Sequence, residues 1–230
     1  MCPQKCPEQQ GLTLFRLTLR SDCPIIGTAA GVRGFFGNAF PNEILLHQHV
    51  PGTSTTLYQY PEVQYRLRDG EVMVIGIADG AGALARVYDK FDEIRLGATI
   101  YPIVERQGEI LTEPFGLTTE EILYRFTSPW VPLSPKNYPR FAAARSRQEQ
   151  TALLERILIG NLLSASKTLG YTAKDRITPS LNDWSLTRAE VKGTEVTGVE
   201  GEFSANFAIP DGLGLGRSVS RGNGAVERAS

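Results

Sequence analysis

The segment QYRLRDGEVMVIGI, residues 64–77, constrains the fold more than any other part of the chain. Two runs rich in β-branched and apolar residues, 63–67 and 72–77, flank the dipeptide Asp69-Gly70. This dipeptide tolerates the positive φ angles of a tight two-residue turn. The segment therefore predicts a β-hairpin, and the fold must contain an antiparallel sheet.

Periodic patterns on both sides of the hairpin indicate further elements. Residues 15–20 alternate between apolar and polar side chains, which predicts a half-buried strand with a basic outer face. Residues 28–46 have helical spacing with a late kink at Pro41, Asp79 is expected to cap a second helix, and residues 93–100 include a short strand. The order strand, helix, strand, strand, helix, strand is that of a ferredoxin-like fold.

Part of this order recurs in the second half of the chain. Residues 105–121 are acidic and contain Gly and Pro, so we expect a linker there. A strand over 122–126, a helix over 148–169 and a hairpin at Lys192-Gly193 follow. We expect a final strand pair to flank the Gly-rich end.

These patterns predict an α+β protein with two tandem ferredoxin-like (RRM-like) domains, each an antiparallel sheet with helices on one face. The expected boundaries are residues 1–108 and residues 109–230. A length of 230 residues with 41% hydrophobic residues is enough for two cores, and it excludes a disordered chain.

Charge and cysteine content narrow the function classes. The 24 basic residues, of which 18 are Arg, nearly balance 25 acidic residues, so any binding to nucleic acid must come from local patches. Arginine favours bidentate contacts to phosphate. The three cysteines, at positions 2, 6 and 23, suggest free thiols. Without an apolar run long enough for a membrane span or a signal peptide, we expect a cytoplasmic protein with no membrane partner.

The two histidines of the chain, His47 and His49, lie two positions apart. In extended chain both imidazoles would face one side, where they could exchange protons with a substrate. They could also be surface residues at a helix end. A metal site would need carboxylates such as Glu43 or Glu62 as further ligands. Because no third histidine exists, we expect neither a metal nor another cofactor.

Other candidate residues are aromatic, Gly-rich or basic. Tyr58 follows the histidines and could donate a hydrogen bond to a phosphate, although tyrosines in strands are commonly packing residues. Near the C-terminus, glycines that allow close backbone approach alternate with residues that bind anions. These candidates for RNA binding are Gly214, Gly216, Arg217, Ser218, Arg221, Gly222 and Gly224. Between Trp130 and Arg147, basic residues including Arg145 are interleaved with Tyr138 and Phe141, which favours a phosphate backbone with stacked bases.

The sequence resembles a known family. Its GLGRSVSRGNG is similar to the Gly-rich loop of the repeat-associated RNA-binding (RAMP) superfamily, and RGFFGNAFPNEILLHQH with YQYPEVQYR resembles the b-subtype of the sixth-numbered CRISPR-associated (Cas) family. The resemblance implies a CRISPR repeat-processing endoribonuclease with tandem ferredoxin-like domains. It implies metal-independent cleavage by 2′-OH attack, which leaves a 2′,3′-cyclic phosphate or 3′-phosphate and a 5′-OH. His47, His49 and Tyr58 match the catalytic positions.

The chain departs from the family pattern at Ala39, where relatives can carry a lysine. Arg33 is the nearest substitute. The resemblance implies CRISPR repeat RNA as a partner, together with effector-complex subunits and a second copy of the chain. Two alternatives remain open: a non-catalytic RNA-binding subunit of a CRISPR effector complex, and a nucleotide-binding or metal-dependent protein unrelated to RNA.

Overall fold

The structure is a computed structural model that describes residues 9–47 and 59–229. Of these, residues 12–47, 59–113 and 219–222 form one compact unit, called here the N-terminal unit. Residues 9–11, 114–218 and 223–229 form the other, called the C-terminal unit. The Gly-rich end is therefore divided between the two units.

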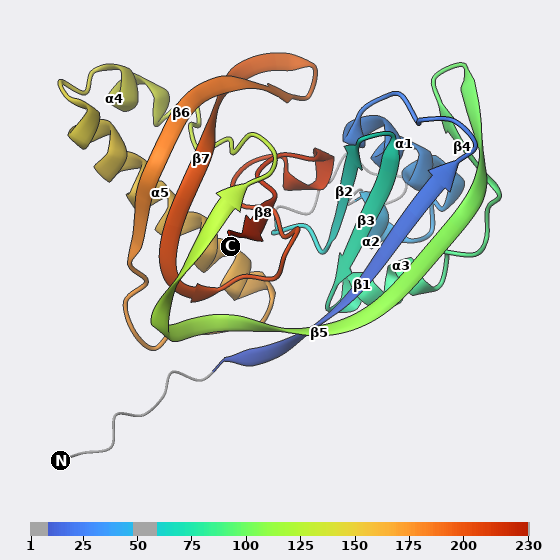
Figure 1. The fold of residues 1–230 in the computed structure, drawn as a ribbon, viewed down its shortest axis with the longest axis horizontal. Helices are drawn as coiled ribbons and strands as arrows, with labels where there is room; N and C mark the ends of the chain where they lie inside the picture. The colour runs from blue at the N-terminus through green and yellow to red at the C-terminus, as the bar shows by residue number, and fades with distance from the viewer. Residues whose placement is uncertain (1–8, 48–58, 230) are drawn as a thin grey trace. The chain divides into compact units, whose positions relative to one another are not determined.

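The N-terminal unit contains an antiparallel sheet in the order β2-β3-β1-β5 (Figure 1). Its strands are β1 (Gln10–Ser21), β2 (Val63–Arg68), β3 (Glu71–Ile77) and β5 (Thr99–Phe126), and β5 continues into the other unit. The predicted hairpin is confirmed, because β2 and β3 pair around Asp69 and Gly70, whose φ angles are 53° and 80°.

Helices cover one face of this sheet (Figure 1). They are α1 (Ala29–Ala39), α2 (Ile44–His47) and α3 (Asp79–Ala85). The interruption expected at Pro41 is confirmed, but it separates two helices where a kink in one helix over 28–46 was expected, because proline cannot donate a backbone hydrogen bond. The expected cap at Asp79 is also wrong: Ala78 occupies the N-cap and makes no side-chain hydrogen bond.

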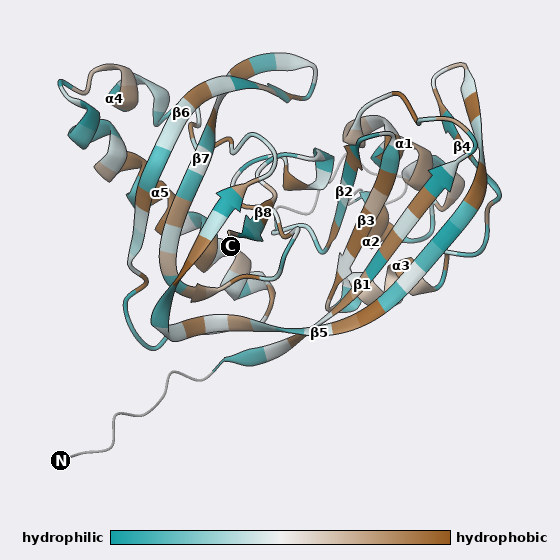
Figure 2. Cartoon of the chain, in the orientation of Figure 1, coloured by the Kyte–Doolittle hydropathy of each residue, from teal (hydrophilic) through white to brown (hydrophobic). Residues whose placement is uncertain are grey.

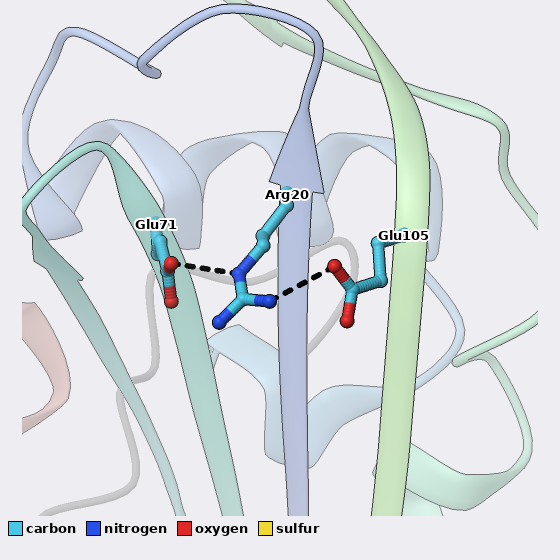
Figure 3. A network of polar contacts seen from close by, with 3 residues as sticks. All are labelled: Arg20, Glu71 and Glu105. Atoms are coloured by element: carbon cyan, nitrogen blue, oxygen red, sulfur yellow. Dashed lines mark hydrogen bonds and ion pairs between the residues drawn. The ribbon is translucent and has the colours of Figure 1, made fainter.

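Apolar residues from alternate positions of β1 and β3 form the core of the N-terminal unit. Leu17, Val72 and Val74 are fully buried against Phe36 of α1. Figure 2 shows the alternation of hydrophobic and hydrophilic residues along β1 and β5. On the polar face, Arg20 donates hydrogen bonds to Glu71 and Glu105, at 2.7 and 2.9 Å (Figure 3).

The C-terminal unit contains a second antiparallel sheet, in the order β5-β7-β6, with β8 also paired to β5. Its further elements are α4 (Tyr138–Ala142), α5 (Arg147–Thr168), β6 (Pro179–Val191), β7 (Thr194–Ala208) and β8 (Val226–Arg228). The expected helix over 148–169 is confirmed by α5, which packs on β6 through buried residues including Leu154, Leu158 and Leu162 (Figure 1).

Two sequence-based expectations are corrected at β5. Residues 105–121 are not a linker, because they lie inside this strand of 28 residues. The fourth strand position beside β1 belongs to β5, whereas β4 (Glu93–Leu96) pairs only with β5. In the N-terminal unit β5 is the edge strand, and an edge position tolerates charges, Gly and Pro because fewer ladder bonds and contacts depend on them.

The expected α+β class with antiparallel sheets in two domains is confirmed. Between β7 and β8, where the chain order of a ferredoxin-like unit has its second helix, the chain contains the Gly-rich segment and a short 3-10 helix, η1 (Val219–Arg221), which belongs to the N-terminal unit. Within residues 9–47 and 59–229, no helix is both long and apolar enough to cross a bilayer.

Candidate functional site

His47 is the last residue of α2, and its position is set by α1. The imidazole Nε2 lies 3.2 Å from the carbonyl oxygen of Pro41. Gly37 of α1 faces His47 so closely that a Cβ at this glycine would lie 3.1 Å from the histidine Cβ. His47 is thus half-buried against a rigid neighbour. His49 and Tyr58, the other predicted catalytic residues, lie outside the described residues.

Arg33 connects α1 to the end of α2. Its Nη2 donates a hydrogen bond to the carbonyl oxygen of His47, one of the carbonyls that a helix end leaves without an intrahelical partner. Burial lowers the pKa of Arg33, and the positive charge of Arg221 lowers it further. Arg33 therefore lies in a positive environment directly beside His47.

A second side chain supports the same helix end. The buried hydroxyl of Tyr65, on β2, donates to the carbonyl oxygen of Leu46 at 2.9 Å. Burial raises the pKa of Tyr65, so this phenol stays protonated and remains a donor. Consecutive carbonyls of α2 are thus bound by side chains from α1 and from the sheet, which fixes the backbone that carries His47.

The Gly-rich end reaches this site through residues 219–222, which pack against β2 and α1. Arg66 of β2 donates to the carbonyl oxygen of Val219 at 2.8 Å, and also to Tyr65 and to the side chain of Gln64. Gly222, with φ of 98°, lies so close to α1 that an added Cβ would meet Ala29 at 2.8 Å. These contacts place Arg221 near Arg33.

Arg66 is the residue that sequence reasoning missed. It is buried and enclosed mainly by neutral oxygens, and burial lowers its pKa to about 10. The available signal was an arginine inside β2, whose residues from Val63 to Arg66 are all buried. A charged residue in such a buried strand indicates that its side chain has a hydrogen-bond partner elsewhere in the fold, which the neighbouring sequence does not reveal.

The other glycines of the predicted loop lie in the C-terminal unit and serve packing. Gly224 has φ of 69°, and a Cβ there would lie 2.0 Å from the carbonyl oxygen of Leu215. Gly216 has φ of 89° and would place a Cβ 2.7 Å from the indole Nε1 of Trp130, while Gly214 is buried. Backbone geometry alone thus requires glycine at 216 and 224, and RNA contact by these glycines stays a prediction.

The predicted basic residues of the C-terminal unit have partners within it. Arg217 donates to the carbonyl oxygen of Leu133 at 3.1 Å, and Ser218 follows with φ of 58°. The guanidinium of Arg147 stacks 3.1 Å above the ring of Trp184 and donates to the Trp184 carbonyl. Arg145 is exposed just before α5, and its backbone N–H donates to the Glu149 carboxylate at 2.8 Å. The structure therefore brings His47, Arg33, Arg221 and Gly222 together in one unit, and Arg145, Arg147 and Arg217 occur in the other.

Two groups of charged residues from the sequence analysis have partners in the structure. The basic outer face of β1 is neutralised, because Arg16 pairs with Glu113 and Arg20 pairs with two carboxylates (Figure 3). The carboxylates considered as metal ligands have other partners: Glu43 accepts two hydrogen bonds from Arg86, and Glu62 accepts one from the backbone of Gly80.

Comparisons with known proteins agree with this arrangement. Models of the Cas6b N-terminal and C-terminal domains match residues 10–113 and 116–229. An uncharacterised protein of Methanocaldococcus jannaschii is 38% identical over 136 residues, which are 59% of this chain and 92% of that protein.

Solved structures extend the likeness to nearly the whole chain. A crystal structure of Cas6b aligns with a TM-score of 0.85 and 29% identity. The alignment covers 96% of this chain and 100% of the Cas6b chain. A CRISPR RNA processing endoribonuclease, also Cas6b, aligns with a TM-score of 0.70 and 27% identity, over 94% and 100% of the chains. A Cas6 product complex at 18% identity shares the fold, with a TM-score of 0.60.

Proposed function

Because the chain belongs to the Cas6b family, we propose that it is an endoribonuclease that cleaves CRISPR repeat transcripts into guide RNAs without a metal ion. The observation that carries the proposal is the packing of segment 219–222 on β2 and on α1, the helix whose Arg33 donates a hydrogen bond to the His47 carbonyl oxygen. A candidate proton-transfer group and an arginine of the Gly-rich segment thereby belong to one unit.

The proposed reaction needs three kinds of groups. The 2′-oxygen before the cleavage site forms a bond to the adjacent phosphorus, and the bond from phosphorus to the 5′-oxygen breaks. A base takes the 2′-OH proton, an acid protonates the leaving 5′-oxygen, and donors stabilise the charge on the phosphorane. His47 and His49 are the proposed base and acid, and either histidine could take either role. Tyr58 is the proposed hydrogen-bond donor.

Arg33 and Arg221 take different parts in this proposal. Because Arg33 is half-buried and bound to the His47 carbonyl, it acts as a positioning residue for the helix end. The charge of Arg221 lowers the pKa of Arg33. Arg221 supplies the positive charge beside the phosphate that a lysine can supply in relatives at the position of Ala39. Two neighbouring positive groups favour an anion close to them.

The test is cleavage of the CRISPR repeat RNA by the purified protein in excess EDTA. The same RNA with a single 2′-deoxy at the cleavage site serves as the matched substrate. We expect the first to be cut and the second to stay intact. Binding without cleavage would instead identify a non-catalytic RNA-binding subunit, and cleavage only after addition of a metal would contradict the proposed mechanism.

Variants separate chemistry from binding. His47→Ala and His49→Ala should lower the single-turnover rate far more than the affinity for RNA. Arg217→Ala and Arg221→Ala should lower the affinity and reduce its salt dependence, because each removes a phosphate contact. Normal rates in both histidine variants would refute the assignment of these residues.

A further inference from the structure

A hollow of about 480 Å³ lies within the C-terminal unit, outside the candidate catalytic site. Three separate segments line it: the Pro-rich stretch with the start of α4, the facing strands β6 and β7, and Arg217 of the Gly-rich segment. The sequence features at Tyr138 and at Arg217 looked unrelated along the chain. The fold joins them in one place.

One wall of the hollow is apolar and aromatic. Leu133, Pro135 and Val196 contribute to it, and Tyr138 retains 49% of its surface exposed. An exposed tyrosine on a short helix contributes little to a core, but its ring offers a face on which a planar base can stack. The hollow therefore combines an exposed aromatic ring, on which a base can stack, with apolar lining residues.

The charged groups on the hollow favour an anion. The backbone N–H of Arg217 donates to the Val131 carbonyl oxygen, and its guanidinium donates to the Leu133 carbonyl oxygen, which anchors the side chain at the hollow. Arg188 of β6 also lines the hollow, 3.8 Å from the carboxylate of Glu195 on β7. Two cations and one carboxylate leave a net positive charge next to the stacking surface.

We propose that this hollow binds one unpaired nucleotide of the RNA, with its base stacked on Tyr138 and its phosphate beside Arg217 and Arg188. The volume lies within the range of roughly 300–1,000 Å³ typical of small-ligand pockets. The proposal rests on the proposed function only because it assumes that the ligand is RNA. A free nucleotide carries the same base and phosphate groups, so its binding is measured in a separate arm of the test.

The test uses CRISPR repeat RNAs in which 2-aminopurine replaces one unpaired nucleotide at a time, bound to the full-length protein. The proteins compared are the wild type, Tyr138→Ala, Tyr138→Phe and Arg188→Ala. Arg140→Ala is the matched control, since this exposed arginine on α4 does not line the hollow. Circular dichroism checks that each variant is folded.

We expect fluorescence quenching at one position in the wild type, its retention in Tyr138→Phe and its loss in Tyr138→Ala. Tyr138→Ala should weaken RNA binding roughly tenfold, in keeping with the loss of one stacked base. Arg188→Ala should lower the affinity for RNA and reduce the dependence of this affinity on salt concentration. Arg140→Ala should leave the position of the quenched nucleotide unchanged. Wild-type affinity and unchanged quenching in Tyr138→Ala would overturn the proposal.

Two further readouts keep the inferences separate. If a free nucleoside monophosphate binds as tightly as the RNA and displaces it, the hollow is a nucleotide site and the proposal fails. A wild type that shows the quenching but does not cleave would refute the nuclease function and leave the nucleotide subsite supported.

Discussion

The guanidinium of Arg66 and the carbonyl oxygen of Val219 are 153 residues apart in sequence and 2.8 Å apart in space. This bond attaches the Gly-rich segment to β2, the strand that also carries Tyr65 and so supports α2. A single buried arginine therefore connects the segment proposed to bind phosphate with the backbone of the candidate catalytic residue.

Replacing Arg66 with methionine should release residues 219–222 from β2. The variant keeps much of the volume of the side chain but leaves the Val219 carbonyl and the Gln64 amide oxygen without this donor. A lost buried bond of this kind costs about 1–3 kcal/mol of the free energy of unfolding. Hydrogen exchange should show faster exchange of the amides in 219–222, and RNA affinity should fall. Unchanged exchange in this segment would contradict the role given to Arg66.

Tyr65→Phe should loosen the end of α2 with little change in packing. The phenylalanine ring fills the same space, but the carbonyl oxygen of Leu46 loses its buried donor, at a cost of about 1–3 kcal/mol. Because His47 is the next residue, the single-turnover cleavage rate should fall while RNA affinity stays close to that of the wild type. Denaturant unfolding and single-turnover kinetics measure the two effects, and an unchanged rate would show that α2 is held by other contacts.

Local signals predicted those parts of the fold whose bonds are local. The β2-β3 hairpin follows from Asp69-Gly70 and its flanking residues, and α5 follows from its apolar stripe. By contrast, β5 was interpreted in part as a linker because its Gly, Pro and acidic residues disfavour a central strand. Its pairing with β1 and β7 depends on residues far away in sequence, which no local pattern contains.

The candidate site divides in the same way. His47 is a prediction from the HxH pair and the family resemblance, and Arg33 is a prediction made because it is the nearest cation to Ala39. The contact between Arg33 and the His47 carbonyl depends on the break at Pro41, which turns α2 back towards α1. The roles of Tyr65 and Arg66 could not be predicted, since their bonding partners become visible only in three dimensions.

The ion pair between Glu43 and Arg86 gives the N-terminal unit a defined pH response. Hydrogen bonds from Arg86 lower the pKa of Glu43 below the ordinary value of 4.5, and these bonds connect the start of α2 to α3. As the pH falls through 4.5, the unfolded chain takes up a proton before the folded one does. The stabilisation is therefore present at neutral pH and is lost on acidification through the lowered pKa.

Glu43→Gln should accordingly lower the urea midpoint near neutral pH, and this difference from the wild type should shrink as the pH drops below 4.5. The same substitution in an Arg86→Met background is the matched control and should have no pH-dependent effect. A difference that is constant across the acidic range would show that the carboxylate does not contribute through its charge.

Gly224→Ala should disrupt the Gly-rich segment through backbone strain, independently of any RNA. The new Cβ would lie 2.0 Å from the Leu215 carbonyl oxygen, at a residue whose φ of 69° already disfavours side chains. We expect a loss of about 3 kcal/mol or more in the free energy of unfolding. Gly34→Ala is the matched control, because α1 leaves open space at that position, and it should stabilise the protein by about 0.5–1 kcal/mol. Urea unfolding of both variants tests the contrast, and equal stability would mean that the segment can shift to accept a side chain at 224.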